Sequence, residues 1–289
     1  MNIIGLGQAG CAIAEKFKQH SQYTVYKIDV GLEGENCFAL EKQDSPEKYE
    51  KSYPKLKAFI KEIKNEVLYI TSAGMVSGAS LHILEQLHKK SCKINILYIK
   101  PDRFHLSETK KLQDNVVYSV LQEYARSGLF NNVLIVDNLM IENILEEVTI
   151  KEYYDKINTL IVSTIHMINV FNNTQAILDT SDDISPSARI STLGLVDIDS
   201  GEEKLFFDIK NWRYKKYYYA IPEETLNSDG SLLKKIKKQI KNKAKDVDER
   251  IRFTYGVYST SYEQTYGYVI VKSSAVQKKM KKTLDNKVC

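Results

Sequence analysis

The first half of the chain alternates short apolar runs with longer amphipathic segments, and this order restricts the possible fold more than any other feature. The apolar runs are rich in β-branched residues and cover residues 2–6, 23–29, 66–71, 94–100 and 132–137. Helix-forming segments lie between them, at residues 11–19, 80–90 and 108–126. Strands that alternate with helices form a parallel sheet covered on both faces. The sequence therefore predicts a doubly wound, mostly parallel α/β domain over residues 1–150.

The second half predicts a long helix followed by a smaller α+β domain. Residues 152–172 contain no Pro or Gly and are apolar around most of the helix circumference, which is typical of a helix buried on several sides. We assign residues 151–173 to a central connecting helix. Strand-like runs at 188–199, 215–222, 250–260 and 265–272, with a basic helix at 231–247, predict a smaller α+β domain over residues 174–272. Residues 273–289 read as a basic tail.

Composition excludes several classes of protein. No apolar run approaches the roughly 20 residues that cross a bilayer. The N-terminus lacks the features of a secretory signal, so we expect a cytoplasmic protein. The four cysteines, Cys11, Cys37, Cys92 and Cys289, lack C-x-x-C spacing and the five histidines are scattered, so we expect no metal site built from protein ligands. The net charge of +4 does not by itself indicate nucleic-acid binding.

A glycine-rich turn joins the first strand to the first helix. Gly5, Gly7 and Gly10 in GLGQAGCAIAEKF have the G-x-G-x-x-G spacing that presents backbone N–H groups to a phosphate. Asp29 ends the second strand, where dinucleotide-binding enzymes hold the ribose of NAD with a carboxylate. One interpretation is an NAD-dependent dehydrogenase that uses these four residues, although no convincing catalytic His/Lys pair follows. Another is that the glycines merely permit a tight turn.

A second glycine-bearing turn helps to distinguish these interpretations. TSAGMVSGAS, at residues 71–80, also lies between an apolar strand and an amphipathic helix. Two helix N-termini at one edge of a sheet can hold a di- or triphosphate together, here through N–H groups around Gly74, Ser77 and Gly78. An NAD domain needs only the first turn, so the pair favours a different nucleotide.

The order of these segments resembles that of the tubulin/FtsZ family. GQAGCAIAEKF, which begins at Gly7, is similar to the first phosphate loop of that family. SAGMVSGAS lies where the family has G-G-G-T-G-[TS]-G, and Gly74, Ser77 and Gly78 match that signature. KPDRF at 100–104 and VDNLMIENIL at 136–145 are similar to two later family segments, so the resemblance spans about residues 1–200. It implies a protein that binds GTP or GDP and forms head-to-tail cytoskeletal filaments.

The resemblance also implies roles for individual residues near the phosphates. Gly7, Gln8, Ala9 and Gly10 would hold phosphate, and the second turn would complete the cradle. Mg²⁺ would accompany the triphosphate and bridge its oxygens, rather than occupy a dedicated cage of protein carboxylates.

Two further pairs of residues match family positions. The central helix of the family begins with an aromatic residue that stacks on guanine and has an Asn four residues later that hydrogen-bonds the base, and Tyr154 and Asn158 have this spacing. ILDTSDD, at 177–183, is similar to the Asn-x-Asp-x-x-Asp loop that enters the neighbouring subunit's nucleotide pocket. Asp179 and Asp182 would then polarise the attacking water in trans. The alternatives are a surface Tyr, a polar helix residue, and acidic residues that only turn the chain.

Departures from the family pattern leave a second function open. Met75 and Val76 place side chains where the family brings backbone close to phosphate, and no glycine-rich loop lies between Asp29 and Ser72. The same fold without GTPase activity, acting as a structural or adaptor subunit, therefore remains an alternative. The amphipathic segment SLLKKIKKQIKNKAK, from Ser231, is either a solvated face or a contact with an adaptor, a DNA-bound complex or an anionic surface.

Overall fold

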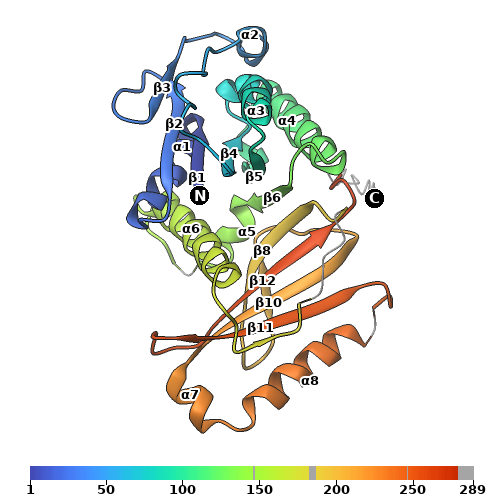
Figure 1. Cartoon of the computed structure of the whole chain (residues 1–289). Helices are drawn as coiled ribbons and strands as arrows, with labels where there is room; N and C mark the ends of the chain where they lie inside the picture. Colours follow the sequence, from blue (N-terminus) through green and yellow to red (C-terminus); the bar gives the residue numbers. More distant parts are fainter. Residues whose placement is uncertain (146, 182–186, 246, 279–289) are drawn as a thin grey trace, which may run out of the picture.

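The structure is a computed structural model that describes residues 1–145, 147–181, 187–245 and 247–278 (Figure 1). The elements of the first half are β1 (Asn2–Leu6), α1 (Gly7–Lys16), η1 (Phe17–Gln19), β2 (Thr24–Val30), β3 (Cys37–Leu40), α2 (Pro46–Lys51), β4 (Glu66–Ser72), η2 (Met75–Ala79), α3 (Ser80–Lys89), β5 (Lys93–Lys100), η3 (Arg103–His105), α4 (Glu108–Arg126), β6 (Asn132–Asp137) and α5 (Asn138–Glu142). The second half consists of α6 (Tyr153–Asn172), β7 (Leu178–Asp179), β8 (Ile190–Val196), β9 (Glu203–Leu205), β10 (Trp212–Pro222), α7 (Glu223–Ser228), α8 (Leu232–Ala244), β11 (Arg252–Thr260) and β12 (Tyr266–Ser273).

The strands form one sheet in the order β3-β2-β1-β4-β5-β6-β8-β12-β10-β11-β7, with β9 beside β8. From β3 to β6 every neighbouring pair is parallel, which confirms the doubly wound α/β prediction. The chain leaves β1 to form β2 on one side and later returns to form β4 on the other. The carboxyl ends of β1 and β4 are therefore the point at which the strand order reverses, where open α/β sheets bind their ligands.

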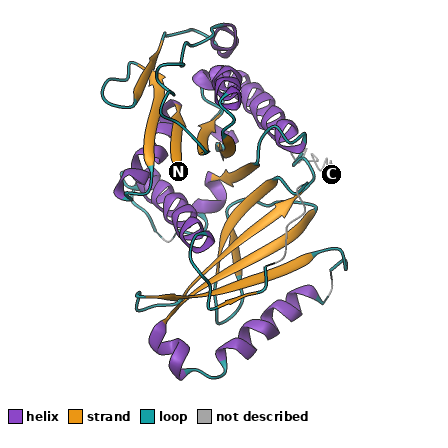
Figure 2. Ribbon diagram, in the orientation of Figure 1, coloured by secondary structure: helices purple, strands orange, loops and turns teal. Residues whose placement is uncertain are grey.

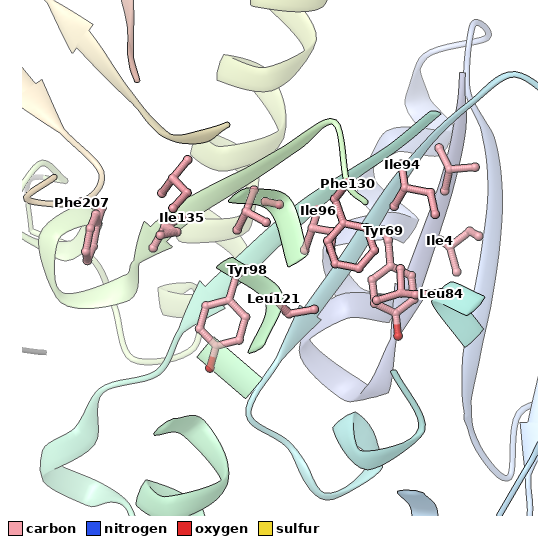
Figure 3. Close-up of a cluster of buried hydrophobic side chains, with 14 of the residues drawn as sticks. Ile4, Tyr69, Leu84, Ile94, Ile96, Tyr98, Leu121, Phe130, Ile135 and Phe207 are labelled. Atoms are coloured by element: carbon pink, nitrogen blue, oxygen red, sulfur yellow. The ribbon is translucent and has the colours of Figure 1, made fainter. Parts of the chain in front are cut away.

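Two apolar layers cover the two faces of this sheet. One face packs against α3 and α4 in the first half and against α8 in the second, with buried residues such as Leu84, Leu121 and Ile236. Figure 3 shows part of this layer, where Tyr69, Tyr98 and Phe130 lie among aliphatic side chains. The other face packs against α1 and α6. Because both faces are covered, the strands read as nearly continuous apolar runs rather than alternating ones.

Helix α6 lies between the first-half sheet and the second-half strands, as the long apolar segment predicts (Figures 1 and 2). Its buried residues include Ile157, Ile161, Ile165 and Ile168. At 20 residues it is about 30 Å long. It therefore reaches from the edge where β1 and β4 end to the edge where they begin.

The second half contains the expected strands, but its sheet is not separate. Val133 of β6 is paired with Ile190 of β8, which joins the two halves into one sheet. The first residues of the expected basic tail are also ordered against the first half, because the N–H of buried Gln277 donates to Oε1 of Gln122 on α4 at 2.7 Å. In the described part of the chain, no helix combines the length and apolarity needed to cross a membrane.

Candidate functional site

Helical turns begin within three residues of the ends of β1, β4, β5 and β6, and two of these starts differ from the other two. After β5 and β6, the side chains of Asp102 and Asp137 cap the next helical turn by accepting from the N–H groups of Phe104 and Leu139. After β1 and β4, α1 and η2 have no side-chain cap and no acidic residue in their first turn. The N–H groups of these two starts therefore have no side-chain cap, which is the arrangement found at helix N-termini that bind anions.

The two uncapped starts lie side by side because β1 and β4 are neighbours. Gly7 has a left-handed backbone with φ of +71°, and a Cβ built on it would lie 2.7 Å from Cγ2 of Val76 in η2. A Cβ on Gly10 would lie 2.5 Å from the carbonyl oxygen of Ile70 on β4. Both glycines are required by close approach, so the spacing predicted from the sequence has a direct structural reason.

The four residues of the first predicted phosphate turn differ in exposure. Gly7 and Gly10 are buried, whereas Gln8 and Ala9 are exposed on the first turn of α1. Asp29 lies at the same edge, because its neighbour Ile28 is paired with Leu6 just before Gly7. Its Oδ1 accepts from the N–H of Val30 at 2.8 Å.

The second turn places its three predicted phosphate-binding residues in different surroundings. Gly74 is exposed, with open space beside its Cα. The N–H of Ser77 donates to the carbonyl of Gly74 at 3.0 Å, and its buried hydroxyl accepts from Gln113 at 3.0 Å. Gly78 packs against the carbonyl of Pro46 on α2. Ser77 and Gly78 thus make contacts within the protein, whereas Gly74, at the beginning of this turn, is exposed.

The two residues assigned to the base lie on the first turns of α6. Tyr154 is 67% exposed and meets the ring of Tyr153 edge to face, with 5.1 Å between the ring centroids. Asn158 is partly exposed one turn later. Nζ of Lys16, at the end of α1, lies 2.7 Å from Oδ1 of Asp155. This ion pair holds α1 beside the helical turn that carries Tyr154 and Asn158.

Asp179 does not join the phosphate turns of its own chain. It lies on β7, which pairs with β11 at the far end of the sheet order from β1. Burial raises the pKa of Asp179, but hydrogen bonds from Ser181 and the charge of Lys216 outweigh that effect, so the pKa lies below its usual value. This carboxylate is therefore ionised at neutral pH. Asp182 lies outside the described residues.

Sequence reasoning did not single out Lys100 and Asp137, which end the neighbouring strands β5 and β6. Nζ of Lys100 lies 2.9 Å from Oδ2 of Asp137, and both side chains are largely buried. The signal was present in KPDRF and VDN, which place a cation and an anion after adjacent strands. This pair neutralises a carboxylate at the edge that carries the uncapped helical starts.

No protein-family model matches the sequence, and no curated protein matches it. Solved structures do match its fold. A GTPγS-form protofilament of TubZ from Bacillus thuringiensis serovar israelensis is 17% identical over 94% of this chain and 86% of that chain, with a TM-score of 0.74. The GDP-form protofilaments of that TubZ give a TM-score of 0.72 at 17% identity, covering 94% and 87%. An empty FtsZ dimer from M. jannaschii gives 0.67 at 12% identity, covering 94% and 87%. Because this likeness extends over both halves of the chain, the protein has the tubulin/FtsZ-like fold.

Proposed function

We propose that this protein binds guanine nucleotide and assembles into head-to-tail filaments. The observation that carries the proposal is the pair of uncapped helical starts at β1 and β4, held together by the contact between Gly7 and Val76. An anionic ligand that reaches both starts is favoured by two helix dipoles. Structures of similar fold are described in GTPγS and GDP forms, which supports a guanine nucleotide as that ligand.

The nucleoside would lie along α1. From Gly7 to Lys16 the helix rises about 14 Å, and its exposed face carries Gln8 and Ala12. That face leads from the phosphate turn to the ion pair with Asp155, beside Tyr154 and Asn158. No group of three His, Cys, Asp or Glu side chains among the described residues can hold a metal ion. A Mg²⁺ ion would therefore be bound mainly by phosphate oxygens and water.

Filament formation is supported by the separation of two surfaces. The phosphate turns lie where β1 and β4 end, whereas Asp179 follows the opposite end of α6 by seven residues. Stacking identical copies head to tail would bring Asp179 of one copy to the nucleotide of the next. Such a contact joins two different surfaces and so continues into an open filament. Solved structures of similar fold include a TubZ protofilament and a two-stranded TubZ filament.

Three measurements test this proposal. The purified protein should retain guanine nucleotide, which is detected by chromatography of the released bases. Electron microscopy at high protein concentration should show filaments with GTP and few without it. Phosphate release should rise steeply with protein concentration, because Asp179 would act only on a neighbour. Absence of both nucleotide and filaments would refute the proposal.

The methyl group of Val76 favours one alternative. It lies against Gly7, where a phosphate would otherwise approach the backbone closely. This supports a subunit that keeps the fold but uses nucleotide weakly, as a structural or adaptor component. Filaments that form equally with and without GTP would favour this alternative. The dehydrogenase interpretation has lost its support, since the likeness to TubZ and FtsZ structures also covers the second half of the chain.

The lysine-rich face of α8 would contact an anionic partner. Leu232 and Ile236 are buried against the sheet, while Lys234, Lys237 and Lys241 are exposed on the outer side. Because its apolar side is already covered, α8 offers charge without an apolar face to insert into lipid, which favours an adaptor or a DNA-bound complex over a membrane surface. Salt-dependent retention of the protein on immobilised DNA tests this contact.

Replacing Asn158 with alanine is expected to weaken GTP binding by about tenfold and to reduce the preference for guanine over adenine. An amide both donates to and accepts from the edge of the base, and leaving those groups unpaired costs about 1–3 kcal/mol. Competition of GDP and ADP against a fluorescent GTP analogue measures both effects. Thr159→Ala is the matched control, because the Thr159 hydroxyl only donates to the carbonyl of Asp155 on the same helix. Unchanged affinity and preference in Asn158→Ala would remove the guanine assignment.

A further inference from the structure

Two lysines on neighbouring strands lie close together on the α6 side of the sheet. Lys216 on β10 is opposite Ile270 of β12, so Lys272 is its diagonal neighbour on the same face. The Lys216 side chain is only 12% exposed. Its Nζ lies 3.7 Å from Oδ2 of Asp179 and 5.0 Å from the centre of the Tyr218 ring. Asp179, which belongs to the predicted acidic loop, therefore also pairs with Lys216.

Lys272 has fewer partners for its charge than Lys216 has. Within the described part of the chain, its ammonium group has no carboxylate within ion-pair distance and no hydrogen-bond partner. Burial lowers the pKa of Lys272, and the positive charges of Lys93 and Lys216 lower it further. A poorly solvated cation between two others opposes folding, since no described carboxylate compensates its charge. Proteins tolerate such arrangements mainly at functional sites.

The position of Lys272 at one edge of the sheet indicates what it would face in a filament. Lys93 begins β5, and Lys272 nearly ends the antiparallel strand β12, so both lie at the edge where the parallel strands begin. The phosphate turns at Gly7 and Gly74 lie at the opposite edge, where β1 and β4 end. In a head-to-tail stack, the lysines of one copy would therefore face the nucleotide of the next copy.

We propose that Lys216 and Lys272 bind the polyphosphate of the nucleotide held by the adjoining protomer and promote its hydrolysis in trans. This inference rests on the proposed function and adds cationic groups to the acidic loop. Water attacks the γ-phosphorus, the bond from that phosphorus to the β–γ bridging oxygen breaks, and GDP and inorganic phosphate leave. The ammonium groups stabilise the negative charge that develops on the bridging oxygen. When Lys216 turns from Asp179 to the phosphates, the carboxylate is released to orient the water, whose proton passes to solvent.

The test compares turnover per assembled subunit in Lys216→Ala, Lys272→Met and the double variant. We expect turnover to fall about 10- to 100-fold in the double variant, while GTP binding by dilute monomers stays unchanged. Lys216→Arg should retain part of the activity, because it keeps the charge. Lys89→Ala, which removes an exposed lysine paired with Glu85 on α3, is the control and should behave as wild type.

Two further measurements separate a role on the neighbour from a structural role. Lys272→Met should raise Tm by about 2–4 °C, because it removes a partly buried charge that no described carboxylate pairs with, even as turnover falls. Mixing the double variant with Gly7→Ala, which keeps the lysines but has a damaged phosphate turn, should restore turnover. If Gly7→Ala does not fold, Asn158→Ala replaces it, at a GTP concentration that occupies the double variant but little of Asn158→Ala, with Asn158→Ala alone as the baseline.

The outcomes are distinct. Wild-type turnover in the double variant, or a slow double variant that mixing does not restore, would overturn the inference while leaving nucleotide binding and filaments intact. A wild-type protein that neither binds guanine nucleotide nor assembles would instead refute the proposed function. Loss of turnover with restoration by mixing would establish that the lysines act across the contact between protomers.

Discussion

Replacing Arg103 with leucine is expected to lower the free energy of unfolding by about 3 kcal/mol. Asp114 on α4 is fully buried, and NH1 of Arg103 lies 2.8 Å from its Oδ2. The hydroxyl of Tyr98 donates to the other carboxylate oxygen at 2.5 Å. Removing the guanidinium takes away a cation that lies against this buried negative charge, so the desolvation of that charge is less well compensated. Urea unfolding should show a lower midpoint with an unchanged slope.

A matched surface pair separates this effect from the general loss of an arginine. Arg126 lies 2.9 Å from Glu123 on the same helix, and both side chains are exposed. Arg126→Leu should therefore change the free energy of unfolding by less than about 1 kcal/mol. Adding Asp114→Asn to Arg103→Leu should recover part of the stability, since an amide is cheaper to bury than a carboxylate. Equal losses in the two arginine variants would show that the buried pair does not stabilise the junction of β5 and α4.

The strands of the first half were predictable because their local composition reflects their burial. The runs at β1, β4, β5 and β6 are apolar and β-branched, as a parallel sheet covered on both faces requires. Two short strands, Cys37–Leu40 and Glu203–Leu205, carry too few residues for any periodicity to show and were not predicted. They exist because longer neighbours offer them a free edge.

The beginning of β10 shows why a strand boundary with charged residues is hard to predict from sequence. The strand was expected from residue 215 but begins at Trp212, and its early residues are basic and aromatic rather than apolar. Lys215 is nonetheless held by Glu203, whose Oε2 lies 2.6 Å from its Nζ, and lies over the Trp212 ring. A charged residue in a strand can be satisfied by a partner 12 positions away, and no local pattern reveals that partner.

In the candidate site, too, features formed by local sequence were predictable, and contacts with distant segments were not. The spacing of Gly7 and Gly10 predicts the tight turn between β1 and α1, because that turn and helix are formed by local sequence. Ser77 and Gly78 match a family signature by spacing alone, but what lies beside them is Gln113 and Pro46, which the chain supplies from other segments. The cluster of Lys216, Lys272 and Asp179 depends on the pairing of β10 with β12 and of β11 with β7, which the sequence does not encode locally.

Replacing Gly7 with alanine is expected to abolish measurable nucleotide binding and to destabilise the fold. A left-handed backbone costs an L-residue about 1–2 kcal/mol, and forcing a methyl group against Val76 adds about 1–3 kcal/mol of overpacking. Gly31 is the matched control, because it also has a left-handed φ, +68°, but has open space beside its Cα. Gly31→Ala should therefore show only the backbone cost, with normal GTP binding.

A double-mutant cycle with Val76→Gly isolates the contact between the two turns. Alone, Val76→Gly should tighten GTP binding, because it removes the methyl groups beside the backbone N–H groups that face the phosphate, although it loses some apolar burial. In its presence Gly7→Ala should cost less than in the wild type, since the 2.7 Å approach to Cγ2 no longer exists. Urea midpoints and GTP affinities, the latter from titration of a fluorescent GTP analogue, are measured for the wild type, the two single variants and the double variant. Strict additivity in both measurements would mean that the two turns do not act on one ligand, and the assignment of a polyphosphate to the turns after β1 and β4 would have to be abandoned.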